Sequence, residues 1–320
     1  MSAAVLVVVE HDRGELPEAS LEALTFARSI ADQLGDAAVE ALLIGASAEA
    51  LAPQGGLFGA SACLLCDDEL LAEYCPDAGA SVVVQAVAAL SPAAVVACGT
   101  DRGNEVLAHV AAELDLPFVA NCLAVKVADD WELTRVQWGG SLNEEARLAS
   151  SMPIVSVAHH GVEAAAADVA GAATLTPLDV SLDESVAATL IQARVVVSEG
   201  VTLATAPVVV GGGRGVGSAE GFEVLEALAN RLGGVVGCSR AVTNNGWRPH
   251  SDQVGQTGTR IAPQLYIACG ISGAIQHWVG AKAAKKILAI NTDPAANMVV
   301  KADYAVIGDL FEVIPAIEQL

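Results

Sequence analysis

The sequence has few aromatic residues, few basic residues and no long uninterrupted apolar segment. Aromatic residues make up 4% of the 320 residues, although 53% are hydrophobic. The apolar content is therefore mainly Ala and Val, which suits helices packed closely on parallel strands. No window reaches the roughly 18 consecutive apolar residues of a membrane span, so we expect no direct membrane insertion.

Basic residues are scarce in the first part of the chain. Residues 1–200 contain 29 Asp and Glu against 7 Lys and Arg, whereas residues 201–320 contain 9 of each. The acidic excess would repel nucleic acid and anionic membrane surfaces, which argues against both classes of partner. The electrically balanced second part can accept an anionic ligand.

The first residues lack the features of a targeting segment. MSAAVLVVVE leads directly into a predicted strand, without the basic start of a signal peptide or the Arg-rich character of a transit peptide. We therefore predict a cytoplasmic protein of bacterial type.

The seven cysteines lack the spacing of a metal site. Cys63 and Cys66 form a single C-x-x-C, and a metal site would need a second pair with similar spacing. Cys63 also lies in a predicted strand and not at the start of a helix. We predict no metal site, and a structural role for the thiols as small buried groups in a reducing compartment.

Short apolar segments alternate with amphipathic ones from residue 3 to about residue 160. This alternation predicts an α/β fold in which a mostly parallel sheet has helices on both faces. One predicted helix spans Ser20–Leu34, with Ser20 as its N-cap. The predicted strands are Ala4–Val9, Val39–Ile44, Ala62–Leu65, Ala93–Cys98, Ala120–Val127 and Ile154–Ala158.

A strand-to-helix turn begins at Gly99. Asp101, Arg102 and Asn104 in this turn could contact a ligand or a partner, but the turn carries no phosphate-binding signature. We favour a plain loop followed by a helix cap.

Three later segments of the first half are less regular. Trp131–Glu145 has alternating bulky residues and turn glycines, which predicts an antiparallel addition to the sheet edge. His159 and His160 are adjacent, and on a strand they would point to opposite faces and could not chelate together. We predict that they are loop or edge residues. Residues 163–184 are rich in small side chains, and we predict that they lead out of a first domain (1–195) towards a second (196–320).

The second domain opens with a buried strand, Pro207–Val210, followed by a Gly-rich turn and a predicted helix. Such a turn offers backbone N–H groups to phosphate. However, the glycines at 213, 215 and 217 do not fit G-x-G-x-x-G, and no G-x-x-x-x-G-K-[ST] occurs. The pattern gives only weak support to an ordinary nicotinamide dinucleotide site.

Two glycine-containing turns bracket a short apolar strand between Val254 and His277. Glycine allows the backbone to approach a ligand closely, and neutral side chains at both turns supply donors and acceptors. Because the carboxyl ends of parallel strands share one edge, we expect the polar groups that follow the strands of this domain to line one site. Six groups are placed in this way: Arg214, Ser239, Gln256, Ser272, Asn291 and Asp309.

Residues that would catalyse a reaction by themselves are not evident in the second domain. GISGA has Ala274 where the nucleophile elbow G-x-S-x-G requires glycine. No carboxylate pair, metal-spaced His cluster or Cys/His nucleophile stands out. These features argue against a hydrolase, and we expect a binding site for a large, flat, partly anionic cofactor that carries the chemistry itself.

Several motifs of the second domain resemble those of the alpha subunit of electron transfer flavoproteins. Their order and spacing match, and the first 200 residues fit the N-terminal domain of that family in size and predicted strand order. The motifs are GGRG at 212–215, SRA at 239–241, VGQTG at 254–258, LYIACGISGAIQH at 265–277, AIN at 289–291 and ADYAVIGDLFEVIP at 302–315.

The resemblance implies one FAD on a doubly wound C-terminal sheet, and a heterodimer with a beta subunit that binds AMP. The flavin would collect electrons from flavin dehydrogenases, such as the acyl-CoA dehydrogenases of fatty acid beta-oxidation, and deliver them to electron transfer flavoprotein-quinone oxidoreductase. Matching positions imply FAD contacts at Arg214, Ser239, Arg240, Val254, Gly255, Gln256, Thr257, Ser272, Gly273, Ala274, Ile275, Gln276, His277, Asn291, Asp309 and Leu310.

Within the resemblance, Arg240 would place a permanent cation near the flavin ring, and His277 a donor near one of its carbonyls. Both would favour added negative charge on the ring. Cys238 departs from the usual motif of the family, and its side chain would lie close to the flavin ring. Three alternatives remain open: an alpha subunit of an electron-bifurcating flavoprotein linked to NADH, a flavin oxidoreductase with its own substrate, and a non-redox nucleotide-binding module.

Overall fold

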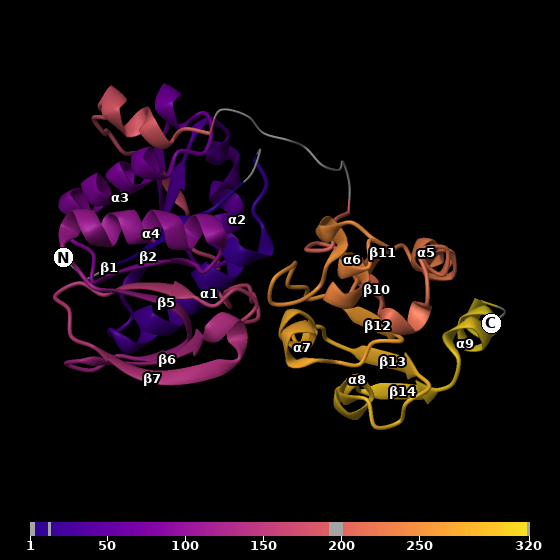
Figure 1. Cartoon of the computed structure of the whole chain (residues 1–320). Coiled ribbons are helices and arrows are strands. Elements are labelled where there is room, and N and C mark those ends of the chain that lie inside the picture. The colour runs from indigo at the N-terminus through magenta and orange to yellow at the C-terminus, as the bar shows by residue number, and fades with distance from the viewer. Residues whose placement is uncertain (1–3, 12–13, 192–200, 319–320) are drawn as a thin grey trace. The chain divides into compact units, whose positions relative to one another are not determined.

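The computed structural model describes the chain except for residues 1–3, 12–13, 192–200 and 319–320 (Figure 1). The chain divides into two compact units, of which the first comprises Met1–Gln137 and Leu142–Arg194 and the second Trp138–Ser141 and Val195–Leu320. The predicted boundary between residues 195 and 196 lies outside the described residues. Each unit is built on its own largely parallel sheet, which confirms the predicted fold class.

The sheet of the first unit has the order β7-β6-β5-β8-β4-β1-β2-β3-β9. Neighbouring strands from β5 to β9 along this order are parallel, whereas β6 is antiparallel to both β5 and β7. The predicted antiparallel addition at the sheet edge is therefore confirmed. The strands are β1 (Ala4–Val9), β2 (Ala38–Ile44), β3 (Ala62–Cys66), β4 (Ala94–Cys98), β5 (Phe118–Lys126), β6 (Trp131–Gln137), β7 (Leu142–Leu148), β8 (Ile154–Val157) and β9 (Thr174–Pro177).

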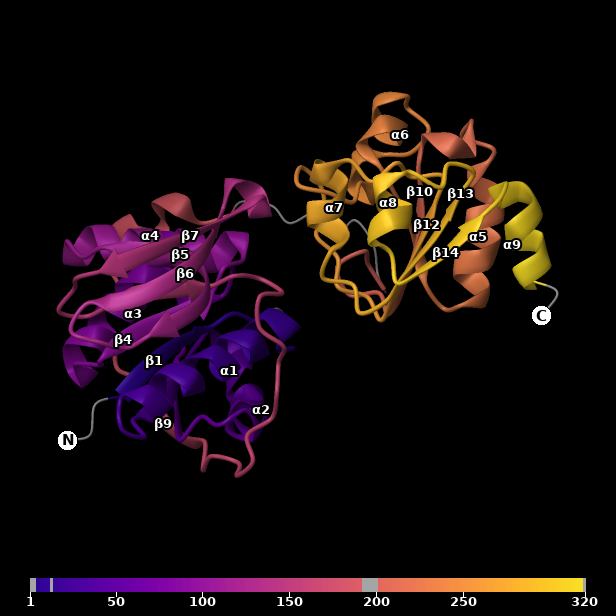
Figure 2. The same ribbon diagram turned by 90° about the horizontal axis from the view of Figure 1, so that it is seen from below.

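Helices cover both faces of this sheet (Figure 2). Helix α1 (Glu18–Gln33) packs through Leu24 and Ile30 on one face, in the same core as Val5 of β1. Helices α3 (Pro76–Leu90) and α4 (Asp101–Leu114) pack on the other face, in a core that contains Leu6 and Leu107. A short helix, α2 (Ala52–Leu57), follows β2. Successive residues of β1 thus enter opposite cores, as the alternation of side chains along a strand requires.

The start of α1 differs from the prediction. The helix begins at Glu18 with Pro17 as its N-cap, so Ser20 lies inside the first turn. The Ser20 hydroxyl donates instead to the carbonyl oxygen of Glu10, at 2.5 Å. The predicted cap at Ser20 is therefore wrong, because its hydroxyl is used to tie the helix to the end of β1. The predicted cap at the turn after Gly99 is confirmed, since Thr100 accepts a hydrogen bond from the backbone of Gly103 at 2.9 Å.

Residues 163–184 do more than connect two domains. Thr174–Pro177 forms β9, which pairs in parallel with β3 at the edge of the sheet. The short strand carries little apolar side-chain signal, and it is held by backbone pairing with β3. A prediction based on side-chain pattern missed it for this reason.

The cysteines are buried and unbridged, as predicted. Cys63 and Cys66 both lie on β3, three positions apart, and they therefore belong to cores on opposite faces of the sheet. The C-x-x-C thus divides its two thiols between separate apolar environments. Burial raises the pKa of both thiols, which keeps them protonated and unreactive.

The second unit is a five-stranded parallel sheet in the order β11-β10-β12-β13-β14. Helices α5 and α9 contribute Leu228 and Ile314 to the core on one face, and α7 and α8 contribute Ala281 and Met298 to the core on the other. The elements are β10 (Val208–Gly212), α5 (Phe222–Arg231), β11 (Val235–Cys238), α6 (Arg240–Asn244), β12 (Leu265–Cys269), α7 (Ile275–Ala281), β13 (Ile287–Asn291), α8 (Asn297–Lys301), β14 (Tyr304–Ile307) and α9 (Leu310–Glu318).

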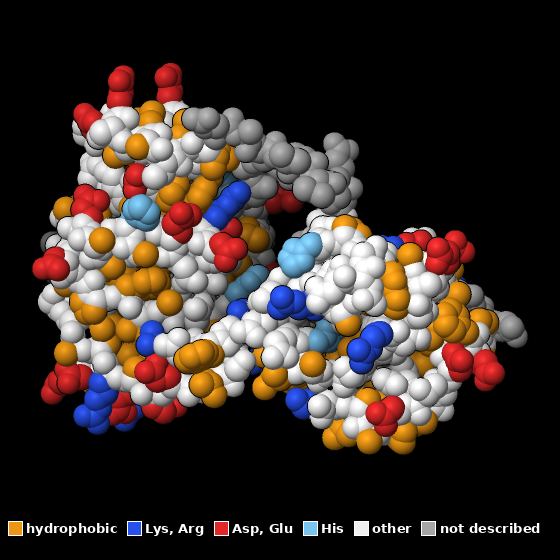
Figure 3. Space-filling view, in the orientation of Figure 1, with side chains coloured by type: hydrophobic (Ala, Val, Ile, Leu, Met, Phe, Trp, Pro, Cys, Tyr) orange, Lys and Arg blue, Asp and Glu red, His pale blue; other side chains and the backbone are white. Residues whose placement is uncertain are grey.

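The surface of the first unit shows the acidic residues that are in excess in its sequence. Acidic side chains are spread over the face of the first unit seen in Figure 3, without forming a single patch. In the described part of the chain, no helix combines the length and apolar character required to span a bilayer.

Candidate functional site

The carboxyl ends of the five strands in the second sheet lie at one edge, because every neighbouring pair is parallel. The strand order reverses at β10, with β11 on one side and β12 on the other. Open α/β sheets bind ligands in the crevice at such a reversal. The six polar residues expected at one edge all lie there, since four follow strand ends and Asn291 is the last residue of β13. The sixth residue, Gln256, lies in a loop that is held next to the end of β11. The backbone N–H of Val254 in this loop donates to the carbonyl of Cys238 at 2.8 Å.

The two loops on either side of the reversal are packed backbone against backbone. Gly213 donates to the carbonyl of Cys269 at 2.8 Å, and Gly215 donates to that of Gly270 at 3.0 Å. A Cβ atom at position 213 would lie 2.2 Å from the Gly270 oxygen, and one at 215 would lie 2.8 Å from the Gly270 Cα. Glycine is therefore required at both positions for the two loops to pack together. The backbone groups of the two loops line the edge.

The loop from Val254 to Gly258 is joined to the start of α7. Gln256 donates its backbone N–H to the carbonyl of Gln276 at 2.7 Å. Gly255 and Gly280 lie so close that a Cβ on Gly280 would be 2.4 Å from the Gly255 Cα. The two turns that bracket β12 in the sequence are thus one structural unit.

His277 is buried at the first turn of α7, with 6% of its surface exposed. Its Nε2 atom lies 2.8 Å from the hydroxyl of Tyr266, which is fully buried on β12. Its Nδ1 atom is buried and makes no hydrogen bond of normal geometry within the described residues. Burial lowers the pKa of His277 to about 4, although the backbone of Val254 acts in the opposite direction. The ring is therefore neutral near pH 7.

Comparisons with known proteins bear on both units. The family described as "Electron transfer flavoprotein domain" matches residues 5–183, and "Electron transfer flavoprotein FAD-binding domain" matches residues 202–282. The alpha subunit of the electron transfer flavoprotein from Bacillus subtilis is 35% identical, covering 100% of this chain and 97% of the relative. That from Mycobacterium tuberculosis is 37% identical over 99% and 98%. This chain belongs to the electron transfer flavoprotein alpha-subunit family. "Protein FixB" from Clostridium saccharobutylicum is also similar, at 34% identity over 97% and 94%.

The sixteen positions that match the FAD contacts of electron transfer flavoproteins divide into two groups. Five are buried within the edge: Val254, Gly255, Gly273, His277 and Leu310. The other eleven are exposed or partly exposed there: Arg214, Ser239, Arg240, Gln256, Thr257, Ser272, Ala274, Ile275, Gln276, Asn291 and Asp309. The structure therefore brings the whole set to one edge, with the buried members as its floor.

Some of these residues also build the loops themselves. Asn291 donates from Nδ2 to the carbonyl of Ile271 at 3.0 Å, and Asp309 accepts from the backbone of Phe311 at 2.9 Å. Gly273 has φ +77°, and a Cβ there would lie 2.3 Å from the backbone nitrogen of Met298. These positions are thus fixed by the fold as well as by any ligand.

Two buried polar residues of the edge were not found from the sequence. Tyr266 bonds to His277, as described above. Gln253, which is 2% exposed, donates to the Thr257 hydroxyl at 3.0 Å and accepts from that of Thr243 at 2.7 Å. Tyr266 lies in an apolar strand motif, which carries no signal for a buried polar contact. The signal that could have identified Gln253 is its position immediately before the VGQTG motif.

Cys238 ends β11 and is fully buried. Burial raises its pKa to about 12, with Asp252 adding to the shift and Arg248 opposing it. The side chain therefore remains an uncharged thiol at the floor of the edge.

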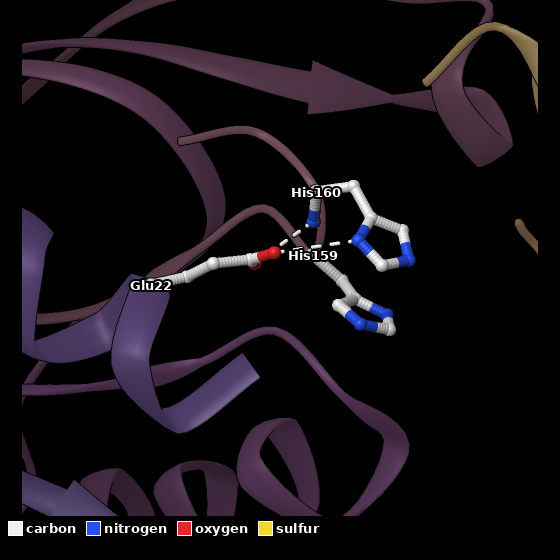
Figure 4. A group of neighbouring side chains, drawn as sticks. All are labelled: Glu22, His159 and His160. Carbon is white, nitrogen blue, oxygen red and sulfur yellow. Dashed lines mark hydrogen bonds and ion pairs between the residues drawn. The ribbon is translucent and has the colours of Figure 1, made fainter. Parts of the chain in front are cut away.

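In the first unit, the predicted loop placement of His159 and His160 is confirmed, whereas the opposite directions expected on a strand do not apply. Both lie in a turn after β8, where His160 has φ +58°, and their rings stack with centroids 3.8 Å apart. Possible ligand atoms of Glu22 and the two histidines all lie within 4.8 Å of one another (Figure 4). The turn, and not a strand, sets their directions. Buried Glu22 accepts from the backbone of His160 at 2.9 Å and pairs with its Nδ1 at 3.3 Å, so the carboxylate already holds the turn.

Replacing Tyr266 by Phe should destabilise the second unit by about 1–2 kcal/mol, because the buried Nε2 of His277 loses its partner. The hydroxyl also abuts Gly211, where a Cβ would lie 2.3 Å from it, so its removal leaves a small gap. Urea unfolding monitored for the second unit measures the loss. A Tyr304→Phe variant is the control, because Tyr304 is 61% exposed and its change should cost little. Equal stability of the two variants would contradict the assigned hydrogen bond.

Proposed function

We propose that this chain carries electrons on one FAD, bound at the carboxyl edge of the second sheet. FAD supplies the ability to accept and release electrons one or two at a time. The chain itself supplies binding, orientation and charge. The observation that carries the proposal is the glycine-lined edge, which has the buried His277 beside it and lies in the region that matches an FAD-binding domain family.

The residues of the edge have distinct roles in this proposal. With Nε2 of His277 accepting from Tyr266, Nδ1 carries the ring's proton and donates to the ligand. The Tyr266 hydroxyl can donate to Nε2, since burial raises the pKa of Tyr266 well above the usual value and keeps the phenol protonated. The backbone groups around Gly270 and Ser272 would hold the pyrophosphate. Gln256 and Thr257 are placed to bond the ring or ribityl chain.

Two arginines supply positive charge at the edge. Arg214 and Arg240 follow β10 and β11, and both side chains are exposed. Among the described residues, neither forms an ion pair with an acidic side chain. A guanidinium stays charged at all working pH values. Arg240 would therefore favour the reduced, more negative form of the cofactor.

We further propose a heterodimer with a beta subunit, which would hold AMP. The first unit, with its acidic surface, would contact that partner. Electrons would come from flavin dehydrogenases such as acyl-CoA dehydrogenases and pass to a membrane quinone oxidoreductase. Similarity to alpha subunits across the full chain supports this scheme.

The deciding experiment is to coexpress the chain with its beta subunit and count the flavins and nucleotides released on denaturation. One FAD and one AMP per heterodimer are expected. Two FAD with NADH-dependent reduction would show a bifurcating protein instead. A colourless complex that binds nucleotide would contradict an electron-carrying role.

Replacing Arg240 by Ala should lower the midpoint potential of the flavin by tens of millivolts. A tenfold weaker preference for the reduced form in a one-electron step corresponds to about 59 mV. Spectroelectrochemical titration of the purified complex measures the change. Arg231→Ala is a matched control, because Arg231 is in the last turn of α5, at the opposite end of that helix from the edge. Unchanged potentials for Arg240→Ala would rule out the proposed charge effect.

A further inference from the structure

The first unit contains a cavity of about 320 Å³ at the carboxyl edge of its own sheet. It is lined by the ends of β1, β2 and β4, by the segment from Leu71 to Cys75, and by the first turns of α3 and α4. The chain runs from β1 to β2 on one side and returns to β4 on the other, so the strand order reverses between β1 and β4. This is the position at which open α/β sheets take ligands. The described residues that line the cavity all belong to the first unit, and none of them is among the residues assigned to FAD.

The walls of this cavity are mainly aliphatic. Val8, Ile44, Leu71 and Val106 contribute apolar surface, and Gly79 leaves room in the wall of α3. Tyr74 adds an aromatic ring, which carries the guanidinium of Arg102 over one face at 4.8 Å. An apolar pocket of this size with a few polar groups suits a small organic molecule with a ring.

Two polar groups of the lining, on Glu10 and His11, are acceptors. The Glu10 carboxylate accepts from the hydroxyl of Thr100 at 2.5 Å, which fixes it in the lining. His11 donates from Nε2 to the carbonyl of Ile44 at 2.6 Å, and its Nδ1 is buried without a partner among the described residues. In the neutral ring Nδ1 is an acceptor. A buried acceptor without a donor indicates that a ligand should bring N–H or O–H groups.

The charges of the lining disfavour a phosphate. Among the described residues, the lining holds two carboxylates, of Glu10 and Glu73, and one guanidinium, of Arg102. The first turn of α4 already has Asp101 near its positive end and Thr100 as its cap. A dianionic group would therefore meet more negative than positive charge.

We propose that this cavity binds an uncharged nucleoside, with its heterocycle between the aliphatic walls and its amino or hydroxyl groups donating to Glu10 and His11. The site lies beyond the proposed FAD function and does not depend on it. Its ligand class follows from the aliphatic walls, from the acceptors of Glu10 and His11, and from the excess of carboxylates over guanidinium among the described lining residues.

The test uses the FAD-loaded heterodimer and equilibrium dialysis with adenosine, with AMP as the charged comparison. Because the partner subunit can also bind a nucleotide, the site is scored as the difference between the wild-type chain and the Gly79→Leu variant, whose side chain fills the cavity. Gly79→Ala is the matched control, since its Cβ would meet only Val106, at an ordinary 3.7 Å. We expect Gly79→Leu to abolish one equivalent of adenosine binding and Gly79→Ala to retain it.

A second variant tests the acceptors without changing the shape of the cavity. Glu10→Gln should weaken adenosine binding severalfold and strengthen AMP binding, because it removes a negative charge and a charge-assisted acceptor. Glu49→Gln, an exposed residue after β2 and outside the lining, should change neither. Equal adenosine binding by wild type and Gly79→Leu would overturn the proposal. So would AMP binding that Gly79→Leu abolishes in the absence of adenosine binding, since the ligand would then be charged.

Discussion

Lowering the pH from about 6.5 to about 4 should destabilise the second unit by about 3 kcal/mol through His277 alone. Burial lowers the pKa of this histidine from 6.5 to about 4, so the unfolded chain binds the proton more readily than the folded one. The contribution is fully present above pH 6.5 and is lost as the pH falls towards 4. Urea unfolding of the complex at several pH values measures it.

The His277→Gln variant isolates this effect from other titrating groups. Glutamine keeps a polar group beside the Tyr266 hydroxyl but does not titrate. The difference in unfolding free energy between wild type and variant should therefore shrink as the pH falls through this window. A difference that is constant with pH would mean that His277 is not held neutral by burial.

Replacing Gly213 by Ala should destabilise the second unit by about 3 kcal/mol and reduce the FAD content of the purified complex. The added Cβ would lie 2.2 Å from the carbonyl oxygen of Gly270. The obstacle is backbone, so no side chain can rotate away, and the cost should reach the upper part of the range for overpacking. The loops after β10 and β12 would have to separate at the point where the ligand edge forms.

Backbone conformation does not confound this test. Gly213 has φ −105°, which an L-residue adopts without strain. The helical Gly79 also tolerates a Cβ in its backbone conformation and has space for it, so Gly79→Ala should be neutral or slightly stabilising. Wild-type stability and FAD content in Gly213→Ala would show that the two loops are not packed as described. Thermal unfolding and the flavin absorbance of the complex provide both readings.

Most strands could be predicted because their cause is local. An apolar segment such as Ala4–Val9 must be buried on both faces, and a parallel sheet covered by helices is the structure that buries it. The shared edge of Arg214 and Asn291 followed from the same reasoning, since residues after parallel strands lie at one end. Strand β9 has no such signal, because pairing with β3 forms it. The start of α1 was misplaced because Ser20 bonds to Glu10, which is near in space through the turn of the chain.

The sequence by itself determined the α/β class, the order of the strands along the chain, the absence of a recognisable catalytic set in the second domain, and the motifs of an electron transfer flavoprotein alpha subunit. Only the tertiary structure decided that Tyr266 bonds to His277, that the turn after β8 places its two histidines beside Glu22 of α1, and that a cavity lies beside Glu10 at the edge of the first sheet. These features join residues that are distant in the chain. Their contacts depend on how each loop directs the backbone, as the positive φ of His160 shows, and no local pattern records that direction.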